Sequence, residues 1–236
     1  MRTGPLTGPL AALEAEVTSC RRCPRLVEWR EQVAREKRAA FADQQYWGRP
    51  VPGFGDPAAR IVVLGLAPAA HGGNRTGRVF TGDRSGDWLF AALHRAGLAN
   101  QPQSVSLDDG LALSDCWVTA AVRCAPPANR PTPTERDACA DWLDGELALL
   151  TRARVIVCLG GFAWDAILRR LVPPRPWPKF AHGAEFVVGE RVLLGTYHVS
   201  QQNTFTGRLT EPMLDAIFSR ANELASPPDA SSLRAR

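Results

Sequence analysis

The amino-acid sequence predicts an α/β fold, a three-layer α/β/α sandwich around a central, largely parallel four-stranded sheet. Short β-branched runs such as RIVVLGL (60–66) and RVIVCLG (154–160) alternate with longer segments of helical pattern. Hydrophobic residues make up 45% of the 236 residues, which is enough to bury a core. No internal repeat or long linker divides the chain, so we expect one domain over 1–225 and a polar, frayed tail over 226–236.

The first elements are expected to be two helices, a strand and a third helix. LAALEAEVT (10–18) and residues 25–40 have helical patterns, and the mixed charges REKR in the second are typical of a solvated helix face. RIVVLGL predicts a buried strand because it is a continuous β-branched run that ends near glycine. A glycine-rich loop then leads to a helix over 85–96.

The rest of the chain continues the alternation of strand and helix. Thr132 is a suitable N-cap for a helix that begins with proline, since its hydroxyl can accept a bond from a free backbone N–H. The expected elements are a strand over 116–122, a helix over 133–150, a strand over 154–160, a helix from Phe162, a hairpin over 185–197 and a helix over 209–224. Ligands of parallel sheets bind beyond the carboxyl ends of the strands. The loops of interest are therefore those after Leu66, Val122, Gly160 and Tyr197.

The chain is mildly basic, with a net charge of +4 and a pI near 8.9. This charge suits a polyanionic partner without requiring one. Only Lys37 and Lys179 are lysines, and this preference for arginine is typical of a GC-rich genome. The sequence shows no signal-peptide pattern and no apolar stretch near the roughly 20 residues of a membrane helix. We therefore expect a soluble, cytoplasmic protein with reduced thiols and no membrane partner.

Six cysteines in a reducing compartment point to ligands, nucleophiles or core residues rather than to disulfides. Cys116 and Cys158 lie within apolar strand runs and are interpreted as small core residues. The other four form two separated pairs, Cys20 with Cys23 in CRRC and Cys124 with Cys139 around the proline-rich APPANRPTPTERDA. Four thiols can complete a tetrahedral zinc site or hold an iron–sulfur cluster, and spacing does not separate these two.

Four motifs occur along the chain in the order SCRRCPRL, VVLGLAPAAHGGNRTGRVFTGD, VTAAVRCAPPANRPTPTERDAC and TYHVSQQNTFTGRLT. Together they resemble the uracil-DNA glycosylase superfamily, specifically its iron–sulfur branch UDGb, over about residues 18–215. The resemblance implies that a structural [4Fe–4S] cluster is held by Cys20, Cys23, Cys124 and Cys139. It also implies a monomeric, monofunctional repair glycosylase that acts on double-stranded DNA containing uracil or other deaminated bases.

The resemblance points to Asp83 and His198 as the catalytic residues. A glycosylase transition state combines a sugar cation with a departing base that carries negative charge. By similarity to the FTGD segment, Asp83 faces the cation or orients water; the alternative is an N-cap for the helix near Ser85. His198, in HVSQQN, matches the donor to the O2 atom of the leaving uracil. The alternative for His198 is an ordinary histidine after a strand.

Further residues of these motifs are expected to contact the flipped nucleotide. Phe80 resembles the aromatic residue on which the base stacks, with a core position as its alternative. The other expected substrate-binding residues are Gly65, Ala67, His71, Asn129, Ser200 and Asn203. The residue that wedges into the duplex is expected among Gln201, Gln202 and Phe205.

Two positions depart from the pattern of related families. Leu66 stands where those families have a carboxylate or asparagine that activates water, which leaves the source of the water open. Ala120 stands where strictly uracil-specific families have an asparagine, and its methyl group cannot read the uracil edge. Because a pocket discriminates through polar groups that the wrong ligand leaves unpaired, we expect weaker action on deaminated purines such as hypoxanthine.

Four arginines beside these loops are expected to contact DNA phosphates, with ordinary surface arginines as the alternative: Arg75, Arg78, Arg123 and Arg208. Both lysines lie outside the motif loops, which argues against a Schiff-base lyase mechanism. Two other functions remain open. The first is an iron–sulfur protein that binds damaged or single-stranded DNA without cleaving it. The second is a zinc-containing nucleotide or small-molecule enzyme on the same kind of sheet.

Overall fold

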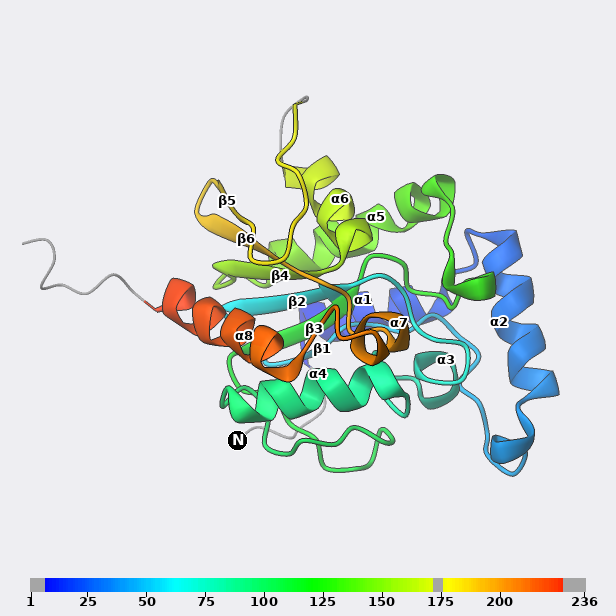
Figure 1. The fold of residues 1–236 in the computed structure, drawn as a ribbon. Coiled ribbons are helices and arrows are strands. Elements are labelled where there is room, and N and C mark those ends of the chain that lie inside the picture. The colour runs from blue at the N-terminus through cyan, green and yellow to red at the C-terminus, as the bar shows by residue number, and fades with distance from the viewer. Residues whose placement is uncertain (1–6, 172–175, 227–236) are drawn as a thin grey trace, which may run out of the picture.

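The computed structural model describes residues 7–171 and 176–226 (Figure 1). Six strands form one sheet in the order β1-β3-β2-β4-β6-β5. Their bounds are β1 Phe54–Gly55, β2 Ile61–Gly65, β3 Cys116–Ala120, β4 Val155–Leu159, β5 Glu185–Val188 and β6 Arg191–Thr196. The predicted tail over 226–236 lies outside the described residues except for its first residue.

Eight α-helices and two 3-10 turns accompany the sheet within the described residues. The helices are α1 Pro9–Ser19, α2 Pro24–Glu36, α3 Gly73–Thr76, α4 Arg84–Arg95, α5 Pro133–Leu149, α6 Gly161–Leu171, α7 Gln201–Phe205 and α8 Glu211–Ala225. The 3-10 turns are Ala39–Phe41 and Pro127–Asn129. None of the described helices is both long and apolar enough to cross a membrane.

The four predicted parallel strands are confirmed as the centre of the sheet. β3, β2, β4 and β6 are parallel neighbours, and every residue of β2, β3 and β4 is buried. The sheet is wider than predicted because β1 and β5 add an antiparallel strand at each edge. β5 is the first arm of the predicted hairpin, whereas β1 has only two residues and leaves no readable hydrophobic pattern.

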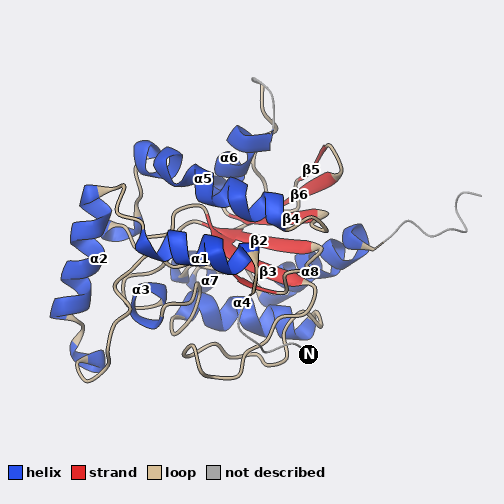
Figure 2. Ribbon diagram, turned by 180° about the vertical axis from the view of Figure 1, so that it is seen from behind, coloured by secondary structure: helices blue, strands red, loops and turns tan. Residues whose placement is uncertain are grey.

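Helices cover both faces of the sheet and make the predicted three layers (Figures 1 and 2). One buried cluster joins α4 and α8 to one face, with Phe90 and Phe218 among its largest side chains. A second cluster joins α1, α5 and α6 to the other face around Trp117 and Trp164. Because neighbouring residues of each strand point to opposite faces, these continuous apolar runs supply both clusters.

Local signals explain where two helices begin and end. Thr132 caps α5 as predicted, and Glu135 completes a reciprocal capping box with it. The predicted helix over 25–40 is too long: α2 stops at Glu36, and Lys37 has a φ of 58°. That left-handed conformation breaks the helical hydrogen-bond pattern, so the charged run lies across the helix end.

Candidate active site and cysteine cluster

The parallel strands end at one edge of the sheet, and the strand order reverses between β2 and β4. From β2 the chain continues to β3 on one side, whereas β4 and β6 lie on the other side. Connections that diverge in this way leave a crevice at the strand ends. The loops that follow β2, β3, β4 and β6 therefore lie together at this edge of the sheet, and we call the region that they share the mouth.

Phe80 covers the end of β2 at the mouth. Its side chain is 6% exposed, and its φ of 53° is uncommon for a non-glycine residue. A Cβ atom on Gly65 would lie 2.6 Å from Phe80 Cζ, so the ring can lie against this strand end only because Gly65 has no side chain. The ring centroids of Phe80 and His198 are 6.2 Å apart. Phe80 is thus a core residue that borders the histidine, while stacking on a base stays a prediction.

Asp83 is the N-cap of α4, as its structural alternative predicted. Its Oδ1 accepts a 2.9 Å hydrogen bond from the N–H of Gly86. Its Oδ2 lies against Gly72, where a Cβ atom would overlap it. Burial raises the pKa of the Asp83 carboxyl, although bonds from the Gly86 and Ser85 amides oppose the rise. Capping is compatible with a second role because the side chain is only partly buried.

His198 follows β6 and is neutral at physiological pH. Burial lowers the pKa of its imidazole to about 4. Asn203 donates a 2.8 Å hydrogen bond from Nδ2 to the His198 carbonyl, which holds the backbone of the loop. Ser200 occupies the N-cap position of α7 without a capping bond from its side chain. Asn203 is therefore a positioning residue for His198, and a neutral His198 can still donate one N–H.

His71 belongs to a short chain of hydrogen bonds that sequence reasoning missed. The Arg38 N–H donates to Tyr46 Oη at 3.3 Å, and Tyr46 Oη lies 3.0 Å from His71 Nδ1. The Tyr46 hydroxyl either donates to Nδ1 or accepts from it, according to the tautomer of His71. Burial and the charges of Arg38 and Arg75 lower the pKa of His71. Tyr46 lies in an irregular segment, so no sequence pattern pointed to it.

The loop that carries Asp83 lies beside the loop that carries His198. The Arg84 guanidinium lies 5.7 Å from the ring centroid of Phe205 on α7. Figure 1 shows α7 next to α3 and the amino end of α4. The Phe205 side chain is 68% exposed, and it is one of the three candidate wedge residues. Phe80, Asp83 and His198 are thus brought to the same side of the sheet edge.

A second aromatic group surrounds Tyr197, directly before His198. His182 stacks on Tyr197 at 5.1 Å, and its Nδ1 accepts a 3.3 Å bond from the Tyr197 N–H. The exposed Arg208 lies over the same ring at 4.6 Å, and its predicted phosphate contact stays a prediction. His182 was missed because it lies in an irregular segment before β5 with no strand or helix period.

Two further predicted substrate residues lie in different surroundings. Ala67 packs against a small apolar cluster that contains Cys124, so it connects the mouth loop to the cysteine region. Asn129 is exposed at the end of a 3-10 turn and has a φ of 55°. Its predicted contact with base or backbone stays a prediction.

The structure does not support three of the four predicted phosphate contacts. Arg75, Arg78 and Arg123 are 8%, 5% and 1% exposed. Arg78 pairs with Asp109 at 2.6 Å, Arg123 pairs with Glu146 at 2.6 Å, and Arg75 donates to two backbone carbonyls. These guanidinium groups hold loops and core together. The sequence could not reveal this, because a buried arginine and a surface arginine look alike until their acidic partners are located.

The four predicted ligand cysteines line one small cavity. They come from the end of α1, the N-cap of α2, the loop after β3 and the middle of α5: Cys20, Cys23, Cys124 and Cys139. Apolar side chains surround them in two small clusters. Among the described residues, no group of three or more Cys, His, Asp or Glu side chains is arranged as a metal site. Four thiols around one small cavity are nevertheless a suitable donor set for zinc or an iron–sulfur cluster.

Two nitrogen donors reach the sulfur atoms of this cavity. Arg30 Nη1 lies 2.8 Å from Cys124 Sγ, and the Arg123 N–H lies 3.3 Å from Cys139 Sγ. Arg30 is 2% exposed, and its Nε has no partner. Burial raises the pKa of Cys124 to about 11 and that of Cys139 to about 12. Arg30 Nη2 lies 4.0 Å from Glu31 Oε1, and metal-bound thiolates would supply a second, closer counter-charge at Nη1. Cys116 and Cys158 are core residues, as predicted.

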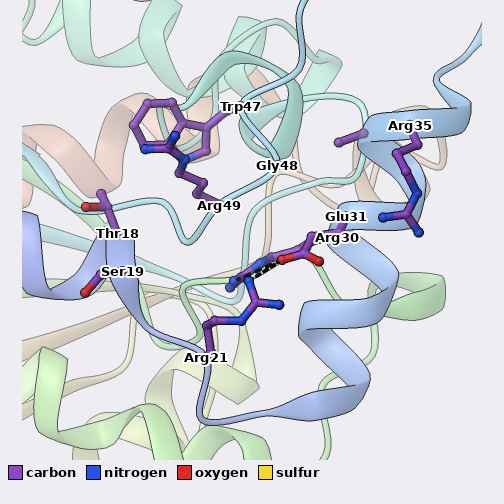
Figure 3. Close-up of a pocket in the computed structure, with 10 residues that line it drawn as sticks. Thr18, Ser19, Arg21, Arg30, Glu31, Arg35, Trp47, Gly48 and Arg49 are labelled. Carbon is purple, nitrogen blue, oxygen red and sulfur yellow. Dashed lines mark hydrogen bonds and ion pairs between the residues drawn. The ribbon is translucent and has the colours of Figure 1, made fainter.

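A separate open hollow of about 530 Å³ lies between α1, α2 and residues 47–49 (Figure 3). Its lining does not include Phe80, Asp83 or His198. Four arginines contribute to it: Arg21, Arg30, Arg35 and Arg49. The hollow is therefore distinct from the mouth, and no sequence pattern predicted it.

The family is established by comparison with known proteins. Residues 52–222 match the model of the uracil DNA glycosylase superfamily, which is most of the chain. The chain therefore belongs to this superfamily, as its motifs indicated.

Within the superfamily, the chain is similar to proteins named Type-5 uracil-DNA glycosylase. It is 59% identical to that of Mycobacterium bovis over 92% of this chain and 82% of the relative. It is 57% identical to that of Mycobacterium leprae, over 92% and 96% of the two chains. It is 54% identical to that of Thermus thermophilus, over 89% and 95%.

Proposed function

We propose that this protein excises uracil from DNA by hydrolysing the bond between the base and the deoxyribose, as a monofunctional repair glycosylase. The observation that carries the proposal is the meeting of Phe80, Asp83 and a neutral His198 at the mouth of the sheet. The superfamily match and the Type-5 relatives support the same activity.

His198 stabilises the departing base. Uracil leaves with negative charge on its ring oxygens, and a donor fixed at O2 binds this charge more tightly than it binds the neutral ground state. Because burial keeps the ring neutral, His198 acts by donating an N–H and not as a cation. Asn203 holds the loop backbone that aims this ring.

Asp83 faces the developing sugar cation or orients the attacking water. Leu66 has no group that could act as a base, so a carboxylate must come from elsewhere in the mouth. Asp83 has one oxygen in the helix cap and a second oxygen toward Gly72. It acts in the ionised form, and its raised pKa moves the acid limit of activity upward.

Double-stranded DNA is the proposed substrate. Excision requires the nucleotide to leave the stack, and an apolar wedge can hold the resulting gap open. Phe205 is the best supported wedge because its side chain is 68% exposed on α7, beside the loop of Asp83. Arg208 is exposed nearby and can contact a phosphate.

The range of bases is proposed to include hypoxanthine as a weaker substrate. Ala120 is fully buried and pairs in register with Gly65 at the strand ends. Its methyl group offers no hydrogen bond that uracil would satisfy and hypoxanthine would leave unpaired. A sharp preference for uracil over hypoxanthine opposite the same base would contradict this assignment.

The cysteine cavity is proposed to hold a structural [4Fe–4S] cluster, bound by Cys20, Cys23, Cys124 and Cys139. When bound, the cluster supplies a covalent cross-link among segments that are distant in the sequence. Arg30 compensates its negative charge from inside the protein. The cavity joins the start of α2 to the proline-rich loop and α5, so the cluster stabilises the flank of the mouth without taking part in the reaction.

The activity is tested by measuring release of free uracil from a duplex under single-turnover conditions, in parallel with binding. We expect excision by the wild type and a loss of about 10²–10³-fold in His198→Gln, since one oxyanion donor is removed. Asp83→Asn should lose about 10²–10⁴-fold. Asparagine also caps helices, so α4 should remain folded. Both variants should still bind the duplex.

Matched controls separate chemistry from charge and folding. Asp87→Asn makes the same charge change in the first turn of α4, and His94→Gln changes an exposed histidine on that helix. Both controls should keep the wild-type rate. A wild type that binds uracil-containing duplex but releases no base would instead establish the binding-only function.

A further inference from the structure

We propose that the arginine-lined hollow between α1 and α2 binds the phosphodiester backbone of the DNA, beyond the contacts made at the mouth. This inference rests on the proposed function, because it extends the surface along which the same duplex lies. Three of the four arginines that were predicted to contact phosphate are buried: Arg75, Arg78 and Arg123. A DNA-binding protein of this charge needs other exposed cations near its site.

The hollow is strongly cationic. Four arginines and one carboxylate line its volume of about 530 Å³, so its formal charge is positive. Figure 3 shows Trp47 and Arg49 on the wall opposite α2, which carries Arg30, Glu31 and Arg35. A concave surface with one sign of charge concentrates the field and favours a polyanion.

Two of the four arginines are already engaged. Arg21 pairs with Glu31, with 2.5 Å between Nη1 and Oε1. Both terminal nitrogens of Arg30 are used, one by Cys124 Sγ and one by the Cys20 carbonyl. These two guanidinium groups shape the hollow and add charge, but they offer few free donors to a ligand.

Arg35 and Arg49 are the free donors. Both are exposed, and neither forms an ion pair within residues 7–171 and 176–226. Arg49 lies over the Trp47 ring at 5.5 Å, which limits its range of positions. The hydroxyls of Thr18 and Ser19 donate to carbonyls of their own helix, so the arginines provide the contacts. The hollow thus suits about two phosphate contacts.

The hollow is connected to the mouth through the backbone. The Trp47 N–H donates to the Arg75 carbonyl at 2.9 Å, and the Gly48 N–H donates to the Asn74 carbonyl at 3.0 Å. Arg75 belongs to α3, in the loop that carries His71, Phe80 and Asp83. At the end of α2, Arg38 is close enough to His71 to lower its pKa. Arg38 beside the mouth loop and Arg35 in the hollow are three residues apart in the chain, so exposed cations link the two sites for a strand that flanks the flipped nucleotide.

The test uses a duplex that contains one 2′-fluorodeoxyuridine, which binds without being cleaved. Affinity is measured between about 50 and 200 mM salt for the wild type and for Arg35→Gln/Arg49→Gln. The slope of log K against log salt is negative, and each lost phosphate contact should reduce its magnitude by about 0.9. The double variant should therefore have a slope smaller in magnitude by about 1.8.

The matched control is Arg152→Gln/Arg154→Gln, which removes two exposed arginines at the amino end of β4, the opposite edge of the sheet. This control should keep the wild-type slope. A duplex shortened on the flank that reaches the hollow should abolish the difference between wild type and the Arg35/Arg49 variant.

Three results would overturn the proposal. The first is an unchanged slope in the Arg35/Arg49 variant, which would favour an acidic protein partner for the hollow. The second is an equal slope change in the control, and the third is a difference that persists on the shortest duplex. A wild type that binds with the expected slope but releases no uracil would refute the proposed activity and leave the binding surface intact.

Discussion

At the scale of single residues, burial decides the chemistry of the candidate site. The imidazole of His198 has its pKa lowered to about 4, and the carboxyl of Asp83 has its pKa raised, both because burial disfavours the charged form. The two groups therefore differ in what they can offer at neutral pH. The neutral ring of His198 can donate one N–H, and ionising the Asp83 carboxyl costs more than it would in water.

The lowered pKa of His198 predicts a change in stability with pH. A base whose pKa is depressed by folding stabilises the protein above its unfolded pKa near 6.5, and this contribution is lost as the pH falls toward 4. Urea unfolding should show that the free energy of unfolding falls more between pH 7.5 and pH 5 in the wild type than in His198→Gln. The difference should be up to about 2 kcal/mol, and less to the extent that solvent reaches the ring.

His71 and His182 also have pKa values lowered by burial, so they contribute to the drop in both proteins. Their contribution cancels in the comparison. Equal drops in the wild type and His198→Gln would show that His198 is not buried as a neutral ring.

At the scale of elements, the loop between β2 and α4 is the part of the site most dependent on close packing. It makes a short helix, α3, and then returns so that Asp83 reaches Gly72. The same return places Phe80 over Gly65 with a positive φ. Such strain persists only where surrounding contacts compensate for it, and it is frequent at functional sites.

Gly72→Ala should therefore impair excision by moving the Asp83 carboxylate. The new Cβ would overlap Asp83 Oδ2, and the shift should also weaken the cap of α4 by about 1 kcal/mol. We expect a lower melting temperature and a single-turnover rate reduced toward that of Asp83→Asn. Binding of the uncleavable duplex should change little.

Gly145→Ala is the control, because it adds the same methyl group inside α5, where only the flexible side chain of Leu13 is near. It should be neutral or stabilising, since alanine favours helix more than glycine does. Full activity in Gly72→Ala would show that excision does not depend on the position of the Asp83 carboxylate.

At the scale of the whole molecule, the cysteine cavity joins parts of the chain that the sheet alone does not hold. The N-terminal helices carry one pair of thiols, and the segment from β3 to α5 carries the other. The family match covers residues 52–222, so the first pair lies outside the matched core of the fold. A metal cluster here would couple the position of α1 and α2, and hence the arginine-lined hollow, to the proline-rich loop.

Cys139→Ser should abolish the bound metal and lower stability by several kcal/mol, because metal-binding free energy contributes to folding. The wild type should be brown, with broad visible absorbance and iron as its metal. Cys158→Ala is the control: it removes a buried strand thiol but should keep the iron content of the wild type. Stoichiometric zinc in place of iron, or unchanged iron in Cys139→Ser, would contradict the proposed cluster.

Sequence reasoning succeeded where a physical pattern is local. The β-branched runs predicted the four parallel strands, and Thr132 predicted the start of α5. It failed where the deciding partner is distant in the chain. The two-residue strand β1 forms only because β3 lies beside it. One local feature was missed as well, since α2 ends at Glu36 and Lys37 adopts a left-handed conformation.

In the candidate site, too, the sequence pointed to some residues and missed others. The motifs pointed to Asp83, His198 and the four cysteines as candidates, because residue type and spacing are properties of the chain itself. They did not identify Tyr46 or His182, whose roles depend on the rings they meet in space. They also assigned Arg123 to DNA, although Glu146 pairs with it in the core.

The sequence by itself thus determined the fold class, the superfamily and the residue types available for chemistry. Only the tertiary structure decided which of those residues are charged, which are exposed and which meet. The physical reason is that hydrophobic periodicity and capping act over a few residues, whereas desolvation and ion pairing depend on every atom that folding brings near. Arg35 and Arg49 are the clearest case, since their availability to a phosphate follows from exposure and from the lack of an ion pair within the described residues.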